Sequence, residues 1–307
     1  MKFLRYLLPA TLSLLIATNV GSQGLDLKGK AKGKISSFKD AKIHAYTQQF
    51  TDSINSFIKN NFENNKYLDF SIDTQEYLKP TFSIMSVNEI VKIDNGTIFN
   101  QTSINTHDGD ETINIGFGTR KLLNDNTIIF GANAFYDHQL TESHERVGVG
   151  VEAITSDFDL RYNHYSAMSG RRTNAEGTIE RALDGWDLRA DYHLPIDHDV
   201  NVFVSAFEFE NPESVSAYKE TGNKFGVDAK VGNFAIEAGY MDDNQENDAY
   251  FGNIKYVVNF GSDNQDHSSS NSKSLTDVSD RLYEPVKREN KIRVVKIDAS
   301  GVVVGGF

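Results

Sequence analysis

The sequence contains no cysteine. This absence excludes a disulfide framework, a thiolate nucleophile and any zinc or iron–sulfur site with cysteine ligands. Proline is scarce, with 5 residues, whereas there are 13 tyrosines and 20 phenylalanines, a composition that suits β-strands better than disorder. Positive charge is also in deficit. The net charge of −12 argues against nucleic acid as a partner, because a phosphate backbone binds positive surfaces.

Long apolar runs are missing as well. The mean hydropathy is −0.44, and no stretch approaches the ~20 consecutive apolar residues of a membrane-spanning helix. The apolar run from Leu7 to Ile16 follows Lys2 and Arg5 and precedes small residues that end at Ser22. This pattern predicts a secretory signal peptide over residues 1–22. Export without a membrane helix leaves three classes: a soluble periplasmic protein, a secreted protein or an outer-membrane barrel.

The next segments differ from the rest of the chain in composition and period. Residues 23–39 are rich in Gly and Lys and are expected to form a flexible linker. Residues 40–64 carry apolar side chains at spacings of three and four, which predicts an amphipathic helix.

Residues 65–260 alternate between apolar and mixed polar positions with a period close to two, which predicts strands. Such strands fit a soluble sandwich or a transmembrane barrel that is apolar outside and polar inside. Opposite charges interleaved on the polar face, and aromatic residues at strand ends, favour the barrel. The residues expected to face its lumen include Asn133, Arg146, Glu152, Asp187, Arg189, Asp191, Asp228 and Lys230.

The connections between the predicted strands alternate in length, which also favours a barrel with short periplasmic turns and long outer loops. The predicted strands are approximately 67–74, 81–91, 96–104, 111–121, 127–137, 146–155, 158–167, 185–194, 200–210, 224–231, 234–241 and 248–260. Their even number places both ends of the barrel on the periplasmic side. The last strand should close the barrel, with Gly252, Tyr256, Val258 and Phe260 in the pattern of a C-terminal assembly signal.

The stretch GANAFYDHQLTESHERVGVGVE, residues 131–152, combines this alternation with residues typical of metal or acid–base sites. Asp137, His138, His144 and Glu152 could form such a site. The hairpin interpretation is favoured: it places the two carboxylates in the lumen near its outer rim and the histidines at the outer loop. Arg171, Arg172 and Arg181, in the long loop after the seventh strand, could contact lipopolysaccharide phosphates or simply face solvent.

Four segments in order resemble the intimin/invasin family, the inverse autotransporters: NIGFGTRKLL, GANAFYDHQLTESHERVGVGVEA, GWDLRADYHLP and RLYEPVKRENKIRV. The resemblance covers about residues 40–296. It implies an all-β fold, a twelve-stranded antiparallel outer-membrane barrel with a periplasmic helix before it. It also implies that residues 261–296 thread the pore, with Arg281, Glu284, Lys287, Arg288, Glu289 and Arg293 in the threading linker. Residues 297–307 would then be a remnant of a displayed passenger.

The resemblance implies an anchor and translocator that exports and displays its C-terminal segment, with a possible role in adhesion, rather than an enzyme. The alternatives are a porin-like or loop-mediated adhesive barrel and, from another class, an outer-membrane hydrolase, for which no nucleophile motif such as G-x-S-x-G is present. No cofactor is expected. The expected partners are outer-membrane lipids and lipopolysaccharide, the barrel assembly machinery, periplasmic chaperones, and a host or neighbouring cell surface.

Overall fold

The computed structural model describes residues 64–76, 78–107, 110–174, 176–196, 198–213, 217–245, 248–259, 275–297 and 303–306. Contacts divide the chain into two compact units, Met1–Asn61 and Phe62–Phe307, and every described residue belongs to the second. The predicted signal peptide, the Gly- and Lys-rich linker and the helix over 40–64 lie outside the described residues, except for Asn64. Within the described ranges, no helix is long and apolar enough to cross a membrane.

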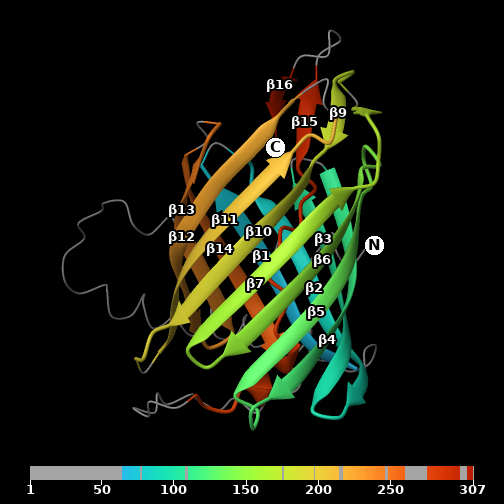
Figure 1. Ribbon diagram of the computed structural model, residues 1–307. Helices are drawn as coiled ribbons and strands as arrows, with labels where there is room; N and C mark the ends of the chain where they lie inside the picture. The colour runs from blue at the N-terminus through green and yellow to red at the C-terminus, as the bar shows by residue number, and fades with distance from the viewer. Residues whose placement is uncertain are drawn as a thin grey trace, which may run out of the picture. The chain divides into compact units, whose positions relative to one another are not determined.

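Twelve antiparallel strands of the described chain close into a barrel (Figure 1), which confirms the predicted fold class. The strands are β1 (Asn65–Gln75), β2 (Thr81–Ile93), β3 (Gly96–His107), β4 (Asp110–Leu123), β5 (Ile128–Gln139), β6 (Glu145–Thr155), β7 (Phe158–Ala167), β10 (Asp184–His193), β11 (Asp199–Glu210), β12 (Lys219–Val231), β13 (Phe234–Asp243) and β14 (Ala249–Asn259). Each pairs with its neighbour in chain order, β7 pairs with β10, and the β1–β14 pair closes the ring. Each of the twelve predicted ranges overlaps one of these strands.

The strands expose apolar side chains and bury charged ones, the reverse of a soluble protein. On β6, Val149 and Val151 are 56% and 46% exposed, whereas Arg146 and Glu152 are 0% and 3% exposed. Successive side chains of a strand point to opposite faces, so one face of β6 is apolar and the other is charged. An apolar outer face and a polar interior are what a membrane-spanning barrel requires.

The two ends of the barrel differ in their connections. One end, the short-turn end, carries residues 94–95, 124–127, 156–157, 194–198 and 232–233. Its turns use residues that tolerate the left-handed backbone region, including Asn95 at φ 53° and Gly232 at φ 58°. The opposite end, the long-loop end, carries the connections 168–183 and 211–218.

A second, four-stranded sheet lies at the long-loop end, and the sequence did not predict it (Figure 1). Its order is β16 (Val303–Gly306), β15 (Val294–Ile297), β9 (Ile179–Ala182) and β8 (Arg172–Thr173). Strands of two to four residues are too short to show a period, and β9 and β15 are far apart in the chain. β12 is also longer than predicted and begins at Lys219 rather than at residue 224.

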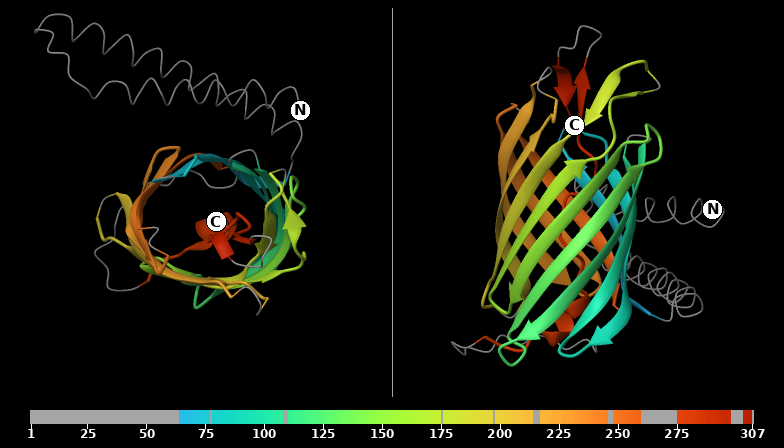
Figure 2. Two further views of the ribbon diagram at one scale, coloured as in Figure 1. Left: turned by 90° about the horizontal axis from the view of Figure 1, so that it is seen from above. Right: turned by 45° about the vertical axis from the view of Figure 1, so that its right-hand side comes forward.

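The chain from the short 3₁₀ helix η3 (Ser279–Tyr283) to the start of β15 runs through the inside of the barrel (Figure 2). Near the short-turn end, the backbone N–H of Val278 donates to the carbonyl of Asn126 at 2.9 Å. The helix η3 follows. Near the long-loop end, the N–H of Leu183 donates to the carbonyl of Arg293 at 3.0 Å. The segment therefore passes from one end of the barrel to the other.

Candidate functional site: the barrel lumen and the segment inside it

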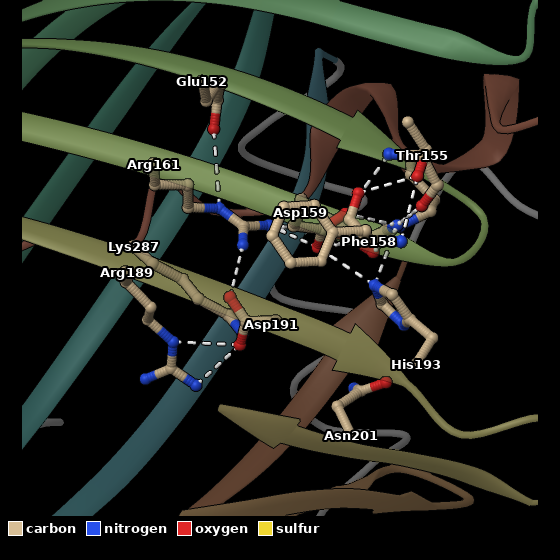
Figure 3. Close-up of polar contacts among 12 residues, drawn as sticks. Glu152, Thr155, Phe158, Asp159, Arg161, Arg189, Asp191, His193, Asn201 and Lys287 are labelled. Atoms are coloured by element: carbon tan, nitrogen blue, oxygen red, sulfur yellow. Dashed lines mark hydrogen bonds and ion pairs between the residues drawn. The ribbon is translucent and has the colours of Figure 1, made fainter. Parts of the chain in front are cut away.

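The lumen wall carries a chain of ion pairs that crosses β7 and β10 (Figure 3). Strand register places Arg161 opposite Arg189 and Asp159 opposite Asp191. Like charges thus face each other directly, and other contacts neutralise them. Arg161 pairs diagonally with Asp191 at 2.9 Å. Along the same strand, Arg161 lies 3.0 Å from Asp159 and Arg189 lies 2.8 Å from Asp191. Buried charges persist only when they are paired in this way.

The inner segment adds cations to this chain near the short-turn end and in the middle of the lumen. Arg281 lies 2.7 Å from Asp159 and 2.8 Å from Glu284. Lys287 lies 2.9 Å from Asp191, which already contacts two wall arginines (Figure 3). The wall carboxylates are therefore shared between wall and segment, and removing the segment would leave them with fewer partners.

Arg288 makes the most enclosed of the described contacts between segment and wall. Its guanidinium donates two hydrogen bonds to the Asp137 carboxylate, at 2.9 and 2.6 Å, and both side chains are almost fully buried. Its carbon Cζ lies 4.3 Å from the centre of the Phe135 ring and 5.4 Å from that of Tyr165. Asp137 also pairs with Arg146 at 2.8 Å. One carboxylate thus holds one arginine of the wall and one of the segment.

Arg293 occupies a comparable position closer to the long-loop end. It pairs with Glu220 of β12 and, at 3.3 Å, with Glu289 of the segment itself. Its guanidinium lies 4.8 and 4.6 Å from the ring centres of Phe207 and Phe209. All six residues predicted for the threading linker therefore form ion pairs: Arg281, Glu284, Lys287, Arg288, Glu289 and Arg293.

Wall side chains also hold the backbone of the segment. Gln101 accepts a hydrogen bond from the N–H of Val286 at 2.7 Å and donates to its carbonyl at 3.4 Å. Arg120 donates to the carbonyls of Leu282 and Glu284. A segment inside a closed barrel cannot join the sheet, because the wall strands already use their backbone groups on each other. Side-chain donors and acceptors take over that role.

Aromatic residues also lie on the inner face, which the sequence pattern predicted to be polar. Each of these rings lies directly across from a glycine on the neighbouring strand. The pairs are Phe99–Gly118, Phe135–Gly116, Tyr165–Gly148, Phe203–Gly226, Phe207–Gly222, Phe209–Gly185 and Phe251–Gly239. At Gly116 an added Cβ would lie 2.2 Å from the Phe135 ring. The alternating glycines therefore make room for rings, and this pattern was the available signal.

The residues predicted to face the lumen differ in their burial. Arg146, Glu152 and Asp191 are buried, and Arg120 donates to Glu152 at 2.7 Å. Asn133 is half-buried beside Gly150, and Asp187 accepts hydrogen bonds from Asn163 and Tyr165. Arg189 pairs with Asp228 and Glu237, and Asp228 also accepts a hydrogen bond from Asn201. Lys230 is exposed at the end of β12.

The strand predicted to close the barrel, β14, lies between β13 and β1. Tyr256 is opposite Phe70 of β1 and packs edge-on against Phe234 of β13, with ring centres 5.3 Å apart. Val258 is opposite Leu68, and the carbonyl of Gly252 accepts a hydrogen bond from Thr74 at 3.1 Å. Phe260, which was predicted with them, lies outside the described residues.

The four residues considered for a metal or acid–base site do not come together. Asp137 is opposite Arg146, and Glu152 is opposite Gly131, six positions further along β5; at about 3.3 Å per residue the two carboxylates are ~20 Å apart along the strands. Glu152 is therefore near the short-turn end, and its placement at the outer rim was wrong, because the returning strand carries it back down the wall. Among the described residues, no three His, Asp or Glu side chains are grouped to hold a metal ion.

His144 lies at the base of the outer hairpin 140–144, between Ser169 and Glu180. Its Nδ1 is 3.3 Å from the Ser169 hydroxyl, and its Nε2 is 3.6 Å from Glu180, whose pKa is lowered chiefly by this contact. The order Ser–His–Glu resembles a hydrolase triad. However, Ser169 is 2% exposed, and its hydroxyl already accepts a hydrogen bond from the backbone N–H of Glu145. The arrangement ties the hairpin 140–144 to the connection 168–183.

The outer-loop arginines contact neighbouring loops. Arg171 and Arg181 both pair with Glu213, at 2.7 and 3.1 Å, which links the connection 168–183 to the connection 211–218. Arg172 donates to the carbonyl of Ser143 at 3.3 Å. All three guanidinium groups are thus engaged in joining loops.

The closed antiparallel barrel with a lipid-facing apolar surface and a charged interior defines a transmembrane β-barrel of the bacterial outer membrane. The family of inverse autotransporter β-domains matches residues 15–290, and the chain belongs to this family. Over 100 residues it is 39% identical to the putative attaching and effacing protein homolog of Escherichia coli K12, covering 32% of this chain and 34% of that protein. Over 99 residues it is 32% identical to the invasin of Yersinia enterocolitica, covering 32% of this chain and 12% of invasin.

A solved structure from work on the in-meso crystallization of membrane proteins shares the fold. It superposes with a TM-score of 0.63 at 18% identity and covers 74% of this chain and 98% of the other. The matched segments span about a third of the first relative and an eighth of invasin, so the activities of those whole proteins are not carried over by the match.

Proposed function

We propose that the barrel is a translocator and anchor, that residues 261–296 are the linker that threads it, and that the following residues are displayed on the cell surface. Residues 261–274 of this linker lie outside the described residues. The observation that carries this proposal is the complementarity between segment and wall along the whole lumen. Arg281, Lys287 and Arg288 each meet a wall carboxylate, at 2.7, 2.9 and 2.6 Å. A segment with charges of both signs is held in a lumen of both signs, and these three cations are compensated by wall carboxylates.

The orientation follows from the connections. In outer-membrane barrels the short turns face the periplasm and the long loops face outward. The short-turn end contacts Val278 and the long-loop end contacts Val295. The segment would therefore enter from the periplasm and leave at the cell surface, with 65–260 as the barrel and 297–307 as the first displayed residues. The lipid-facing surface would contact membrane lipids, and assembly would require the barrel assembly machinery and periplasmic chaperones.

Single-cysteine labelling in intact cells tests this proposal, because the sequence has no native cysteine. A cysteine added after Phe307 should react with a membrane-impermeant maleimide in intact cells. Ser156→Cys, in a turn at the short-turn end, is the matched control and should react only after the outer membrane is permeabilised. Reaction of the C-terminal cysteine only after permeabilisation would refute export of the segment.

Channel recordings distinguish a translocator from a porin-like or loop-mediated adhesive barrel. The full chain should show low conductance in planar bilayers, because the segment from Arg281 to Arg293 contacts the inner wall of the ring. Deletion of residues 261–307 should open the pore, since the charged wall would then line water. High conductance of the full chain would favour the porin-like alternative.

A further inference from the structure

We propose that Asp137, Phe135 and Tyr165 form a guanidinium-binding site that fixes the position at which the segment comes to rest in the lumen. The proposal rests on the proposed translocation, since it concerns where a moving chain stops. Its basis is the enclosure of Arg288: two hydrogen bonds to Asp137 and two aromatic rings surround one guanidinium group. A planar fork that binds a carboxylate with two parallel bonds and stacks on rings is specific to arginine.

The wall is shaped for this group before the segment arrives. Phe135 lies over Gly116, and Tyr165 lies opposite Gly148, where an added Cβ would be 3.2 Å from both the Tyr165 ring and the Arg288 guanidinium. Asp137 is fixed independently by Arg146 at 2.8 Å and by Asn114 at 2.7 Å. The carboxylate and the Phe135 ring belong to β5 and the Tyr165 ring belongs to β7, on either side of β6, and the segment supplies only the guanidinium.

The same wall residues grip the backbone on the far side of Arg288. Tyr165 accepts a hydrogen bond from the N–H of Glu289 at 2.8 Å. Arg146 donates to the carbonyl of Glu289 at 2.7 Å, and Asn114 donates to that of Asn290 at 2.9 Å. Side-chain recognition and backbone binding are thus coupled in one place. A backbone contact accepts any residue, so the guanidinium is what distinguishes one position of the chain from the next.

Neighbouring residues of the segment do not fit this site. A shift by one residue would bring Lys287 or Glu289 to it, and a shift by two would bring Val286 or Asn290. Lysine lacks the planar fork, and glutamate would oppose the Asp137 carboxylate. Lys287 in its present place shows the contrast, because it remains 35% exposed and contacts Asp191 through a single atom.

Disulfide trapping at the long-loop end reads out the position of the segment. Arg181 and Val295 are direct partners in the β9–β15 pair. In isolated outer membranes, full-length protein with cysteines at Arg181 and Val295 should oxidise efficiently, and pairs with residues 294 or 296 should do so poorly. The readout is the yield of the 181–295 disulfide divided by the yield of the 181–294 or 181–296 disulfide. Arg288→Ala should lower this ratio about ten-fold, corresponding to a lost preference of about 1.4 kcal/mol. Lys291→Ala, which removes another cation of the segment, is the control and should leave the ratio unchanged.

Chemical rescue tests the nature of the ligand. Millimolar guanidinium chloride should restore the ratio in Arg288→Ala, whereas sodium chloride and urea, a neutral molecule of similar shape, should not. Arg288→Lys keeps the charge and should behave like Arg288→Ala; it also replaces that variant if heat-modifiable migration shows that Arg288→Ala does not assemble.

The outcomes separate this inference from the proposed function. A 181–295 disulfide that forms equally with or without Arg288, or a loss that guanidinium does not reverse, would overturn the guanidinium site and leave translocation standing. A different result is failure of the disulfide to form in the protein that carries both cysteines and an intact Arg288. That result would reject the exit of the segment through the long-loop end, and the guanidinium site with it.

Discussion

The segment inside the barrel is held by side chains over one part of its length and by backbone pairing over the next. From Arg281 to Arg293 it contacts the wall through ion pairs and side-chain hydrogen bonds. From Val294 to Ile297 it is a strand paired with β9. The reason is the availability of backbone groups. The barrel wall has used its own in the closed ring, whereas β9 lies outside the ring and offers a free edge.

The two kinds of contact differ in what they can recognise. An ion pair such as Arg288–Asp137 depends on the identity of both residues and on their alignment. The strand pair depends mainly on the backbone and on an apolar face, here Val295 and Ile297, which pack with Leu183 and Phe209 at the mouth. Contacts in the lumen therefore depend on which residues the segment carries, whereas the strand pair at the mouth is compatible with a wider range of sequences.

The largest loss of stability is expected from a substitution in the lumen, where the contacts depend on residue identity. Asp137→Ala removes the counterion of both Arg146 and Arg288, each almost fully buried. Leaving buried charges without partners should lower the free energy of unfolding by about 3–5 kcal/mol. Urea unfolding of the refolded protein in detergent measures this. The control is Asp228→Ala, because Asp228 is 21% exposed and its loss should cost about 1 kcal/mol or less. Equal losses of stability from the two substitutions would contradict the expectation that the enclosed Asp137 contributes more than the partly exposed Asp228.

A smaller effect is expected at the mouth. Val295→Asp places an unpaired charge in the apolar cluster of Leu183 and Phe209, at a cost of about 2 kcal/mol or more. Because β15 can detach without opening the barrel, the loss should be local. Hydrogen exchange should show faster exchange at residues 294–297 and unchanged protection in β5 and β6. Lys296→Ala should leave both regions protected, and loss of protection in β5 would show that mouth and wall unfold together.

A still smaller effect is expected when the wall beside the guanidinium is altered. Gly116→Ala would place a Cβ 2.2 Å from the Phe135 ring, so the ring must move. Overpacking of this kind should cost about 1–2 kcal/mol. Gly170→Ala is the matched control, because no atom lies within 4 Å of its added Cβ. Thermal unfolding of both variants compares them, and an equal melting temperature would show that the ring has room to spare.

The smallest effect concerns pH at the outer hairpin. Partial burial, the charge of Asp110 and a hydrogen bond to it raise the pKa of Glu142 from 4.5 to about 7. The folded hairpin then binds a proton more tightly than the unfolded chain does, so this contribution to stability is full below pH 4.5 and is lost as pH rises through 7. The change should be about 1 kcal/mol or less, because the side chain is only partly buried. The free energy of unfolding measured from pH 4.5 to 8 should depend less on pH in Glu142→Gln than in the unmodified protein. An unchanged dependence on pH would exclude Glu142 as its source.

The sequence alone determined the wall of this protein. Two-residue alternation fixes which side chains share a face, and turn residues such as Asn95 and Gly232 mark where strands reverse, so twelve strands and their faces could be predicted. Both signals are local, because a strand directs successive side chains to opposite faces whatever it pairs with.

Only the tertiary structure decided the partners. Asp137 and Arg288 are 151 residues apart in the chain, and no local pattern indicates that they meet. The rings opposite the wall glycines, the position of Glu152 near the short-turn end and the pairing of β9 with β15 depend likewise on how strands align and where the segment lies. Alternation is set by neighbours in the chain, whereas pairing is set by the closure of the ring and by the path that the segment takes through it.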